Sequence, residues 1–540
     1  MRRRGWAILL FLAVLAFFTI TLQPSLAWGD GIRLQREVVT AESFLLAEIQ
    51  DVVFADDPLP FARLGVAAWD HPLYVMLGHS LLQVLPGIYN LWLVNFLSAL
   101  FGAGAICLLF LLIVRHTRSN SASLLAALAL AVAHTFWWHA VTPEVYTLFA
   151  FLLLLAGYWF DTYEVNGRFR YLFAAAVALG LGMANHLLAV LAVPALILYL
   201  LLERKQSRQL RLKPVQLLWL MAAFLIGFAP YGLQFVRLLR TFTLAEVLGT
   251  AVGTTFLQGS TAPSLAMLGQ SVFSYLIFLF YQFLLVGVLL GLYGWLVGRS
   301  AYRALWSKAA AFYLVYLAFG LLYRVSDQFA FFLGAHIFWA VAIGMGIAQL
   351  EAQVWPDRRR LLAAVLALPI LLTPLFYDAA PDLLQRVGIT EEFFGVPQVG
   401  SGVRDGLAYY VNPNKDGDIS ADAFGRQTLR NLAPDALVVA EWYTDTDEYF
   451  VLGYLQAVEG LRPDVELVTW TTVDPFSFDP LLAVEVVAEA LPQRPVYLAS
   501  LSKEFYDAPT LLDEYCIVEE DLLYRVYARD DGVERPCLQP

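Results

Sequence analysis

The chain has 540 residues and is too apolar to be wholly soluble: 59% of its residues are hydrophobic and 15% are charged, against roughly 45–50% and 25% in soluble domains. This composition excludes a disordered or nucleic-acid-coating chain, and three cysteines exclude a disulfide scaffold or a cysteine-rich zinc site. The net charge of −11 is unevenly divided. Residues 378–540 carry 11 Lys and Arg against 30 Asp and Glu, whereas residues 1–377 carry 24 against 16. We therefore expect a mildly basic membrane domain over 1–377 and an acidic soluble domain over 378–540.

Eleven segments of the membrane domain read as spanning helices, each of which needs about 20 mostly apolar residues. They are residues 5–28, 91–114, 122–140, 143–161, 171–185, 186–202, 215–235, 269–297, 307–323, 329–350 and 361–377. The pair 171–202 is short and could be divided elsewhere. The first segment could be a signal peptide, since Ser25-Leu26-Ala27 resembles a cleavage site. Its apolar run exceeds the roughly 7–15 residues of a signal sequence, which favours a retained anchor.

The basic loops set the expected orientation. With the N-terminus in the cytoplasm, the loops on that side hold 18 Lys and Arg and the opposite loops hold 6, as the positive-inside rule requires. The segment 72–89 would invert this arrangement if it spanned the membrane. Because His79, Gln83 and Pro86-Gly87 interrupt it, we interpret it as an interfacial helix. Residues 29–90 then form a long first loop outside the cytoplasm, and the acidic domain is outside as well.

The soluble domain shows strands alternating with helices. The expected strands are 437–443, 465–470 and 495–500, with helices over 447–458 and 480–491 between them and further strands possible over 515–519 and 522–528. Such alternation predicts a small α/β unit with a parallel sheet. Cys516 and Cys537 lie in this domain, in a compartment that permits a disulfide, whereas Cys107 lies in a membrane helix and is expected only to pack.

The stretch 412–419 resembles the first half of a calcium-binding loop, with oxygen-bearing side chains at alternate positions and Gly417 for the turn. However, position one is Asn412, and Ala423 stands at position twelve, where a bidentate Glu is required. A surface turn rich in Asn, Asp and Gly is the favoured interpretation.

Titratable and amide side chains recur at the outer ends of the expected spans. They are Glu42, Asp70 and His71 in the first loop; His139 and Glu144 between spans three and four; Asn185 and His186 between five and six; Arg237 and Arg240 after seven; and Arg324 and Asp327 between nine and ten. Each alone has a structural explanation, such as capping a helix. Such groups are costly against lipid and usually functional, and five separate segments bring them to one depth. We therefore expect Glu42 and Asp70 to face one cavity, lined or supported by Glu144, His186 and Asp327.

Several longer motifs resemble a known family in collinear order. They are residues 70–74 (DHPLY), 95–103 (NFLSALFGA), 135–148 (TFWWHAVTPEVYTL), 180–187 (GLGMANHL) and 454–465 (YLQAVEGLRPDV). They resemble the DUF2723 membrane proteins, which are similar to the C-type (GT-C) glycosyltransferases, including the transmembrane protein O-mannosyltransferases. The resemblance implies a polytopic α-helical membrane protein of GT-C-like fold, with about 11 transmembrane helices and a C-terminal extracytoplasmic α/β domain.

The resemblance also implies an activity. Such enzymes move a sugar from a polyprenyl-phosphate carrier to an acceptor hydroxyl at the outer face of the membrane, with an acid of the first loop as general base. The family usually has an Asp-Ser-Gly-Glu-like motif early in this loop. The stretch that we matched to it is Val39 to Phe44, in which Glu42 takes the place of the Glu and the Asp is missing. Either Glu42 or Asp70 is then the base, with Glu42 preferred, or the site has lost catalysis.

The transfer would need a carboxylate to accept the hydroxyl proton and cations to stabilise the leaving phosphate. Arg237, Arg240 and Arg324 could bind that phosphate or, equally, lipid headgroups. The remaining candidate substrate-binding residues are His71, His139, Glu144, Asn185, His186 and Asp327. Because His139, Glu144 and His186 do not have metal-ligand spacing, no cofactor is assigned, although a divalent cation stays open. The expected partners are a polyprenyl-phosphate-linked sugar, a protein or glycan acceptor and membrane lipids, with no nucleic acid.

Two other functions compete with this interpretation. A catalytically degenerate scaffold or binding protein in cell-surface glycan assembly is favoured by the missing Asp of the first-loop motif. A transporter would place charged residues near the middle of the membrane, but apart from His134 the titratable groups lie near the outer ends.

The orientation can be tested with reporter fusions. We expect a phosphatase that is active only outside the cytoplasm to be active when it is fused after Pro540, because the loop charges place residues 378–540 outside. Activity of a cytoplasm-restricted reporter at the same position would contradict the topology.

Overall fold

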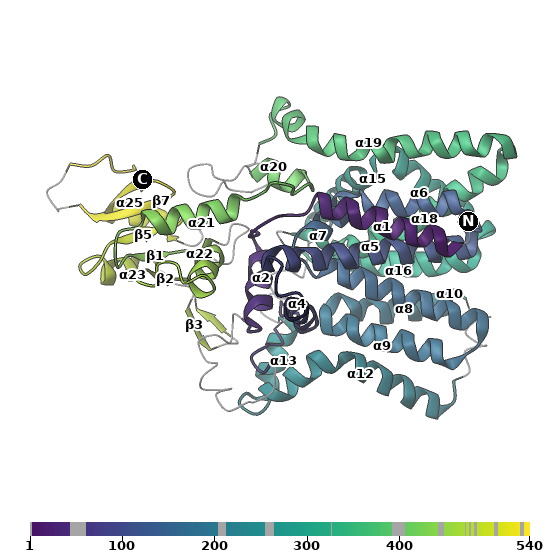
Figure 1. Ribbon diagram of the computed structural model, residues 1–540, viewed down its shortest axis with the longest axis horizontal. Coiled ribbons are helices and arrows are strands. Elements are labelled where there is room, and N and C mark those ends of the chain that lie inside the picture. Colours follow the sequence, from purple (N-terminus) through teal and green to yellow (C-terminus); the bar gives the residue numbers. More distant parts are fainter. Residues whose placement is uncertain are drawn as a thin grey trace.

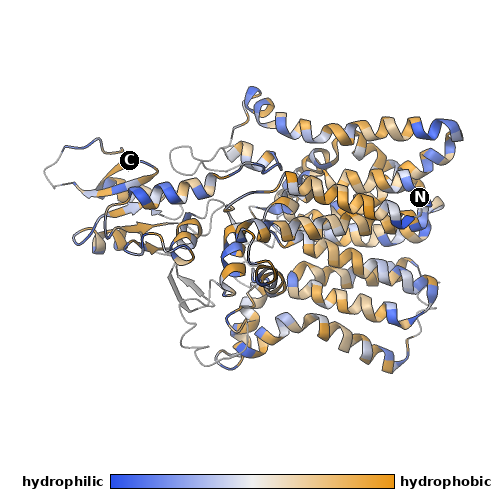
Figure 2. Ribbon diagram, in the orientation of Figure 1, coloured by the Kyte–Doolittle hydropathy of each residue, from blue (hydrophilic) through white to orange (hydrophobic). Residues whose placement is uncertain are grey.

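The computed structural model describes residues 3–43, 61–67, 69–203, 212–253, 264–325, 327–390, 406–440, 448–469, 471–474, 477–479, 483–501, 506–529 and 534–539. These residues form a bundle of long apolar helices with a smaller α/β domain at one end (Figure 1). Hydrophobic residues make up most of the length of the bundle helices, and hydrophilic residues gather at their ends (Figure 2).

The bundle reproduces the expected spans. Its helices are α1 (Arg3–Ile20), α5 (Asn90–Thr117), α6 (Asn120–Ala131), α7 (His134–Val141), α8 (Tyr146–Asn166), α9 (Phe169–Asn185), η2 (Leu187–Leu191), α10 (Ala192–Leu202), α12 (Pro214–Leu238), α15 (Leu265–Ala301), α16 (Arg303–Leu322), α17 (Gln328–Phe331), α18 (Leu333–Gln353), η3 (Pro356–Arg358) and α19 (Arg359–Arg386). Among the described residues, 8 helices are long and apolar enough to span, α6 and α7 form a further bent pair, and α9 and η2–α10 are shorter apolar helices. Each of the eleven expected segments coincides with one of these. The helix α19 continues to Arg386, so the expected domain boundary at residue 377 falls inside it.

Short helices lie at the end of the bundle next to the α/β domain, which we call the domain-facing end. They are α2 (Asp30–Thr40), α4 (Pro72–Val84) and α13 (Leu244–Val252). In Figure 1, α2 runs across the direction of the bundle helices and α4 is seen end-on. The 13 residues of α4 are fewer than the about 20 of a span, as expected for an interfacial helix. A side chain at Gly78 would meet Val38 at 2.7 Å, so α4 packs directly on α2.

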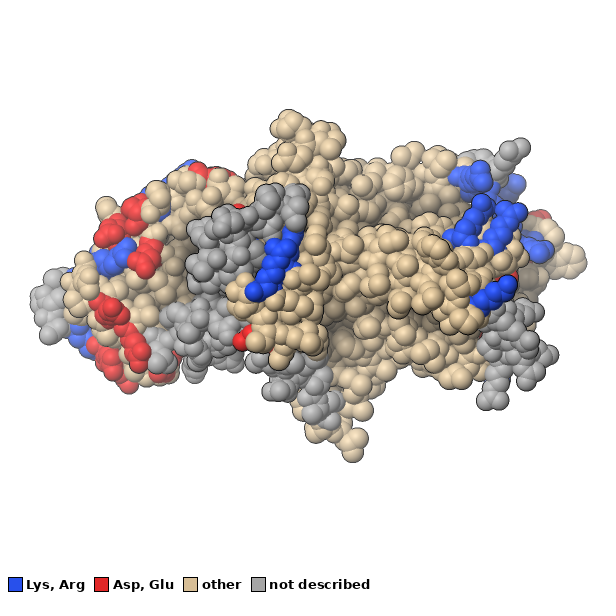
Figure 3. Space-filling model, turned by 90° about the horizontal axis from the view of Figure 1, so that it is seen from below, with Lys and Arg blue, Asp and Glu red and all other residues tan. Residues whose placement is uncertain are grey.

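The two ends of the bundle differ in charge. The N-terminus lies at the end away from the α/β domain (Figure 1). Lys and Arg side chains gather at that end, whereas Asp and Glu are prominent on the domain (Figure 3). This arrangement agrees with the expectation that most Lys and Arg residues of the loops lie on one side of the membrane. Which side of a membrane each end faces stays a prediction.

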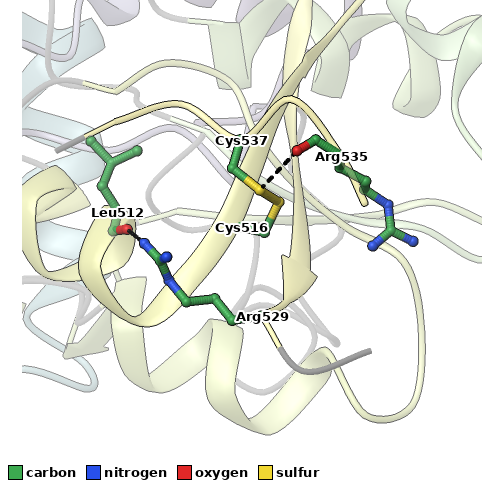
Figure 4. Close-up of a disulfide and its surroundings, with 5 residues drawn as sticks. All are labelled: Leu512, Cys516, Arg529, Arg535 and Cys537. Carbon is green, nitrogen blue, oxygen red and sulfur yellow. Dashed lines mark hydrogen bonds between the residues drawn. A yellow bond between two sulfur atoms is a disulfide. The ribbon is translucent and has the colours of Figure 1, made fainter. Parts of the chain in front are cut away.

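The α/β domain contains α20 (Gly406–Val411), α21 (Ser420–Asn431), β1 (Leu437–Val439), α22 (Glu448–Ala457), β2 (Glu466–Val468), β3 (Thr471–Asp474), β4 (Ser477–Asp479), α23 (Ala483–Ala490), β5 (Val496–Leu498), α25 (Ala508–Glu514), β6 (Tyr515–Glu520) and β7 (Leu523–Ala528). Its main sheet has the order β2-β1-β5-β7-β6. The expected parallel pairing holds for β1 with β2 and β5. The two further strands, for which the sequence predicts no direction, are antiparallel: β7 pairs with both β5 and β6 in this way, and β6 and β7 form a hairpin. The expected Cys516–Cys537 disulfide is present (Figure 4).

Two bundle elements are broken, and side chains of α15 and α19 hydrogen-bond to backbone groups at the breaks. The pair α6 and α7 bends by 66°, and α15 is interrupted at Leu284, where φ is 50°. The backbone N–H of Thr135 donates to Gln282 Oε1 (2.8 Å), and that of His134 donates to the Tyr377 hydroxyl (3.0 Å). Since lipid offers no hydrogen bonds, irregular backbone at membrane depth has to be satisfied within the protein.

The other end of the bundle is held by a charge cluster around Asp161, whose side chain is 1% exposed. Its carboxylate accepts from Arg115 Nη1 and His116 Nε2, both at 2.8 Å, and pairs with Lys308. One acid on α8 thereby joins α5 to α16.

The cluster predicts a stability effect. Asp161→Asn leaves Arg115 and Lys308 without their shared carboxylate, and breaking a buried ion pair costs about 3–5 kcal/mol. We expect a clearly lower midpoint of thermal unfolding in detergent. The control is Asp357→Asn, which makes the same change at an exposed position in η3. Equal midpoints for the two variants would contradict the prediction.

Candidate active site

Five segments bring polar side chains together at the domain-facing end. They are the start of α2, the stretch 61–71 before α4, the connection 142–145 between α7 and α8, the junction of α9 with η2, and the loop before α17. All lie at the ends of helices, where polar groups are not forced against lipid.

A buried guanidinium organises the first of these segments. The side chain of Arg33 is 4% exposed and pairs along α2 with Asp30 (3.5 Å) and Glu37 (3.4 Å). Its charge also acts on Asp70 and Glu144. Asp30, by contrast, is 64% exposed and lies in the first turn of α2, where the helix dipole stabilises a negative charge.

Asp70 is buried near Arg33, whose charge acts on it. Its carboxylate accepts from the Ser43 hydroxyl (3.1 Å) and the Ala67 backbone N–H (2.8 Å). A Cβ at Gly65 would lie 2.0 Å from it, so only glycine fits there. Burial raises the pKa of the Asp70 carboxyl, and the positive charge of Arg33 opposes that rise.

His71 links the first loop to α9. Its Nδ1 lies 2.8 Å from the Asn185 carbonyl oxygen, and its ring stacks on that of His186 with centroids 5.2 Å apart. Burial lowers the pKa of His71 well below its usual range, and the nearby His186 and Arg33 lower it further. The ring is therefore neutral at pH 7. Asn185 Nδ2 in turn donates to the Val145 carbonyl (3.0 Å), which ties α9 to the connection 142–145.

Glu144 lies in that connection, outside the spanning helices. Ser98 Oγ accepts from its backbone N–H and donates to its carbonyl oxygen, both at 3.0 Å. Burial raises the pKa of Glu144 well above its usual range, and the negative charges of Asp30 and Asp327 add to the rise. The neighbouring Tyr146 ring lies 4.5 Å from the His139 ring and 5.2 Å from the His186 ring, centroid to centroid.

The structure therefore gathers most of the residues singled out from the sequence. Asp70, His71, His139, Glu144, Asn185, His186 and Asp327 are connected through the contacts and charges above. Glu42 instead pairs with Arg63 at 3.0 Å. The side chain of Glu42 is 39% exposed and that of Arg63 is 35% exposed. That Glu42 and Asp70 share a cavity stays a prediction.

The three arginines differ in their surroundings. The buried Arg237 donates to the Phe61 carbonyl and to Gln234 Oε1, both at 3.1 Å, and so holds the first loop against α12. Arg240 is exposed and Arg324 is half-buried beside the loop before α17.

Sequence reasoning missed Asp30 and Arg33. A signal was present, because Asp30-Gly31 follows the first span directly and Arg33 and Glu37 repeat at helical spacing after it. The first-loop motif matches Glu42 instead, and the count of loop charges gives Arg33 no role in the site. Within the described ranges, no group of three or more His, Cys, Asp or Glu side chains is arranged to hold a metal ion. In the stretch 412–419, Asn412, Asn414 and Asp418 accept from backbone N–H groups two residues ahead, as in a turn.

Comparisons with known proteins identify sequence relatives of the membrane domain. The family model for the N-terminal domain of the protein O-mannosyl-transferase TMEM260 matches residues 68–209. The protein O-mannosyl-transferase TMEM260 of Mus musculus is 27% identical over 230 residues, which are 42% of this chain and 29% of the mouse protein. The match thus covers less than a third of that relative's length.

Solved structures resemble the whole chain. ArnT from Cupriavidus metallidurans has a TM-score of 0.59 at 16% identity in the apo state, covering 99% of this chain and 100% of that one. The same protein bound to undecaprenyl phosphate has a TM-score of 0.57 at 16% identity, covering 98% and 99%. The oligosaccharyltransferase AglB from Archaeoglobus fulgidus, in complex with an inhibitory peptide and a dolichol-phosphate, has a TM-score of 0.50 at 13% identity, covering 99% and 75%. The expected GT-C-like fold and the resemblance to O-mannosyltransferases are confirmed.

The environment of Glu144 predicts a pH-dependent stability. Its native pKa lies above the unfolded value of about 4.5, so the native state binds the proton more tightly. Its contribution to stability is therefore full at low pH and is lost as pH rises through the native pKa. Glu144→Gln stays neutral, so we expect it to unfold at a higher temperature than the wild type at pH 8, with a smaller difference at pH 5.

The control for this prediction is Glu42→Gln, which makes the same change at a half-exposed ion pair and should not stabilise the protein at pH 8. Thermal unfolding in detergent at both pH values measures the effect. A Glu144→Gln variant that is less stable than the wild type at pH 8 would show that the carboxylate is satisfied in the native state.

Proposed function

We propose that this chain, which resembles the GT-C-type O-mannosyltransferases, is a membrane glycosyltransferase that takes a sugar from a polyprenyl-phosphate carrier and transfers it to an acceptor hydroxyl. The observation that carries the proposal is the carboxylate cluster of the domain-facing end, in which an exposed Asp30 stands beside the buried Arg33 within a GT-C-like fold. We further propose that this end faces the outside of the membrane.

The comparisons support the choice of donor and acceptor. ArnT binds undecaprenyl phosphate, and AglB forms a complex with a peptide and dolichol-phosphate. The mouse relative is a protein O-mannosyl-transferase. We therefore propose a mannosyl residue as the sugar, a polyprenyl phosphate as the leaving group and a hydroxyl side chain of a protein as the acceptor.

The proposed reaction is a single displacement. The base takes the proton of the acceptor hydroxyl, the hydroxyl oxygen forms a bond to the anomeric carbon, and the bond from that carbon to the phosphate oxygen breaks. The configuration at the anomeric carbon inverts, and polyprenyl phosphate leaves with the electron pair. One carboxylate suffices as base, because no covalent enzyme intermediate is formed.

Three carboxylates of the first loop are candidates for the base. Asp70 is buried under Ser43 and Ala67, so an acceptor cannot approach it directly. Glu42 is engaged by Arg63. Asp30 is open to solvent, and it lies beside Arg33 in the first turn of α2. We therefore assign the role of the base to Asp30. We assign to Asp70 the role of a buried carboxylate that supports Arg33.

The remaining side chains have proposed binding roles. Arg324 and Arg240 are accessible to a carrier phosphate, whose oxygens match a guanidinium fork. Arg237 acts through the first loop, since its guanidinium is occupied by the Phe61 carbonyl. Glu144, His139 and His186 surround Tyr146 and would contact the sugar.

The test is transfer from mannosyl-phosphoundecaprenol to a Ser/Thr-rich peptide by the purified full-length chain. Loss of a general base lowers the rate by about 10²–10⁴-fold, and we expect Asp30→Asn to fall in this range. Glu42→Gln should keep most of its activity, because an exposed ion pair contributes about 0–1 kcal/mol.

Two outcomes would contradict parts of this proposal. If Glu42→Gln is inactive and Asp30→Asn is active, the base is Glu42. If a folded wild-type chain transfers no sugar but binds the carrier, the protein is a scaffold for glycan assembly and not an enzyme.

A further inference from the structure

The junction between the α/β domain and the bundle has an apolar part, in which Trp28 and Ile32 share a core with Phe424, and a polar part around the ammonium of Lys415. This residue is 2% exposed, and its Nζ lies 3.8 Å from the centroid of the Trp138 ring and 4.2 Å from that of Tyr409. Nζ also donates to the Asn412 carbonyl at 2.8 Å and to that of Tyr409. An ammonium removed from water is costly unless it is compensated, and two ring faces with two carbonyls provide that compensation.

The same part of the domain holds the segment that leads to Asp30. The backbone N–H of Lys415 donates to the Thr21 carbonyl at 3.2 Å. Five residues further on, Ser420 Oγ accepts from Trp28 Nε1 at 2.8 Å, and the Phe424 ring lies 5.5 Å from that of Trp28. Residues 21–28 are thus fixed to the domain immediately before Asp30 begins α2.

Trp138, the other aromatic partner of Lys415, lies near the site residues His139 and Glu144. Trp138 lies on α7, one residue before His139 and six before Glu144. The ring of Tyr410 stacks on Trp138 at 5.6 Å and 10°, and the Tyr410 carbonyl lies 2.7 Å from His134 Nε2. The stretch 409–415 therefore clamps α7 from the side of the domain.

From this placement we propose that Lys415 is a positioning residue for glycosyl transfer: its ammonium holds the α/β domain against α7, the same part of the domain holds residues 21–28, and Asp30 is thereby set opposite Glu144. The proposal rests on the proposed function for its catalytic part. It gives the domain a role inside the active site, because the two carboxylates are carried by separate segments that the domain holds in common.

The test replaces Lys415 by Met, which keeps the aliphatic stem and removes the charge. Since misplacement by about 1 Å can cost about 10²-fold in rate, we expect kcat per folded molecule to fall at least about tenfold, with the KM for mannosyl-phosphoundecaprenol unchanged within about twofold. Lys415→Arg should recover much of the rate, because guanidinium also binds to aromatic faces. A merely structural role would reduce the folded amount but not kcat.

Arg494→Met is the matched control. It removes a cation of the same domain that pairs with Asp435 and Glu466, away from the junction, and its kcat should equal that of the wild type. If Lys415→Met does not fold, Trp138→Phe replaces it. This variant keeps a ring and weakens the cation–π contact, and we expect a drop in kcat of about threefold.

A second readout does not depend on activity. Amide hydrogen exchange of peptides covering residues 21–40 should be faster in Lys415→Met than in the wild type and unchanged in Arg494→Met. If exchange is faster in Lys415→Met but kcat is unchanged, the positioning role is wrong. If neither exchange nor kcat changes, Lys415 does not hold residues 21–40 at all. A wild type without transfer would overturn the proposed function, while the exchange data would still decide whether Lys415 holds residues 21–40.

Discussion

A guanidinium that is removed from water has to be neutralised by carboxylates close to it, and this requirement shapes the domain-facing end of the molecule. Arg33 is almost fully buried, and it draws Asp30 and Glu37 along its own helix and acts on Asp70 and Glu144 from other segments. The acids outnumber this cation. Burial raises the pKa of the deeper acids, Asp70 and Glu144, while Asp30 is exposed to solvent.

A second constraint is that no backbone group at membrane depth can be left unsatisfied. The breaks in α6–α7 and α15 would each expose such groups, and Gln282 and Tyr377 satisfy them across the bundle. The bend at α7 has a further consequence. It aims the end of α7 at the junction with the α/β domain, where Trp138 meets Lys415, and sends the following connection with Glu144 toward α2.

The site is therefore assembled by packing over long distances in the chain. His71 reaches Asn185 across 114 residues, and Trp28 reaches Ser420 across 392. The assembled site also contains unfavourable interactions. The half-buried Glu144, near Asp30 and Asp327, is the clearest instance, and we expect stability to be traded for reactivity there.

Local patterns in the sequence determined the apolar segments, the basic loops, the interfacial character of α4 and the positions of β1, β2 and β5, because helix and strand periodicity depend only on neighbouring residues. The sequence left the bridge between Cys516 and Cys537 open, and the structure shows it. Only the tertiary structure decided that β7 runs antiparallel to β5, that Glu42 turns to Arg63, and that Asp30 and Arg33 belong to the site. Each of these features depends on the partner that a buried charge or a strand edge contacts. Packing between elements far apart in the chain decides those partners, and no local sequence pattern records them.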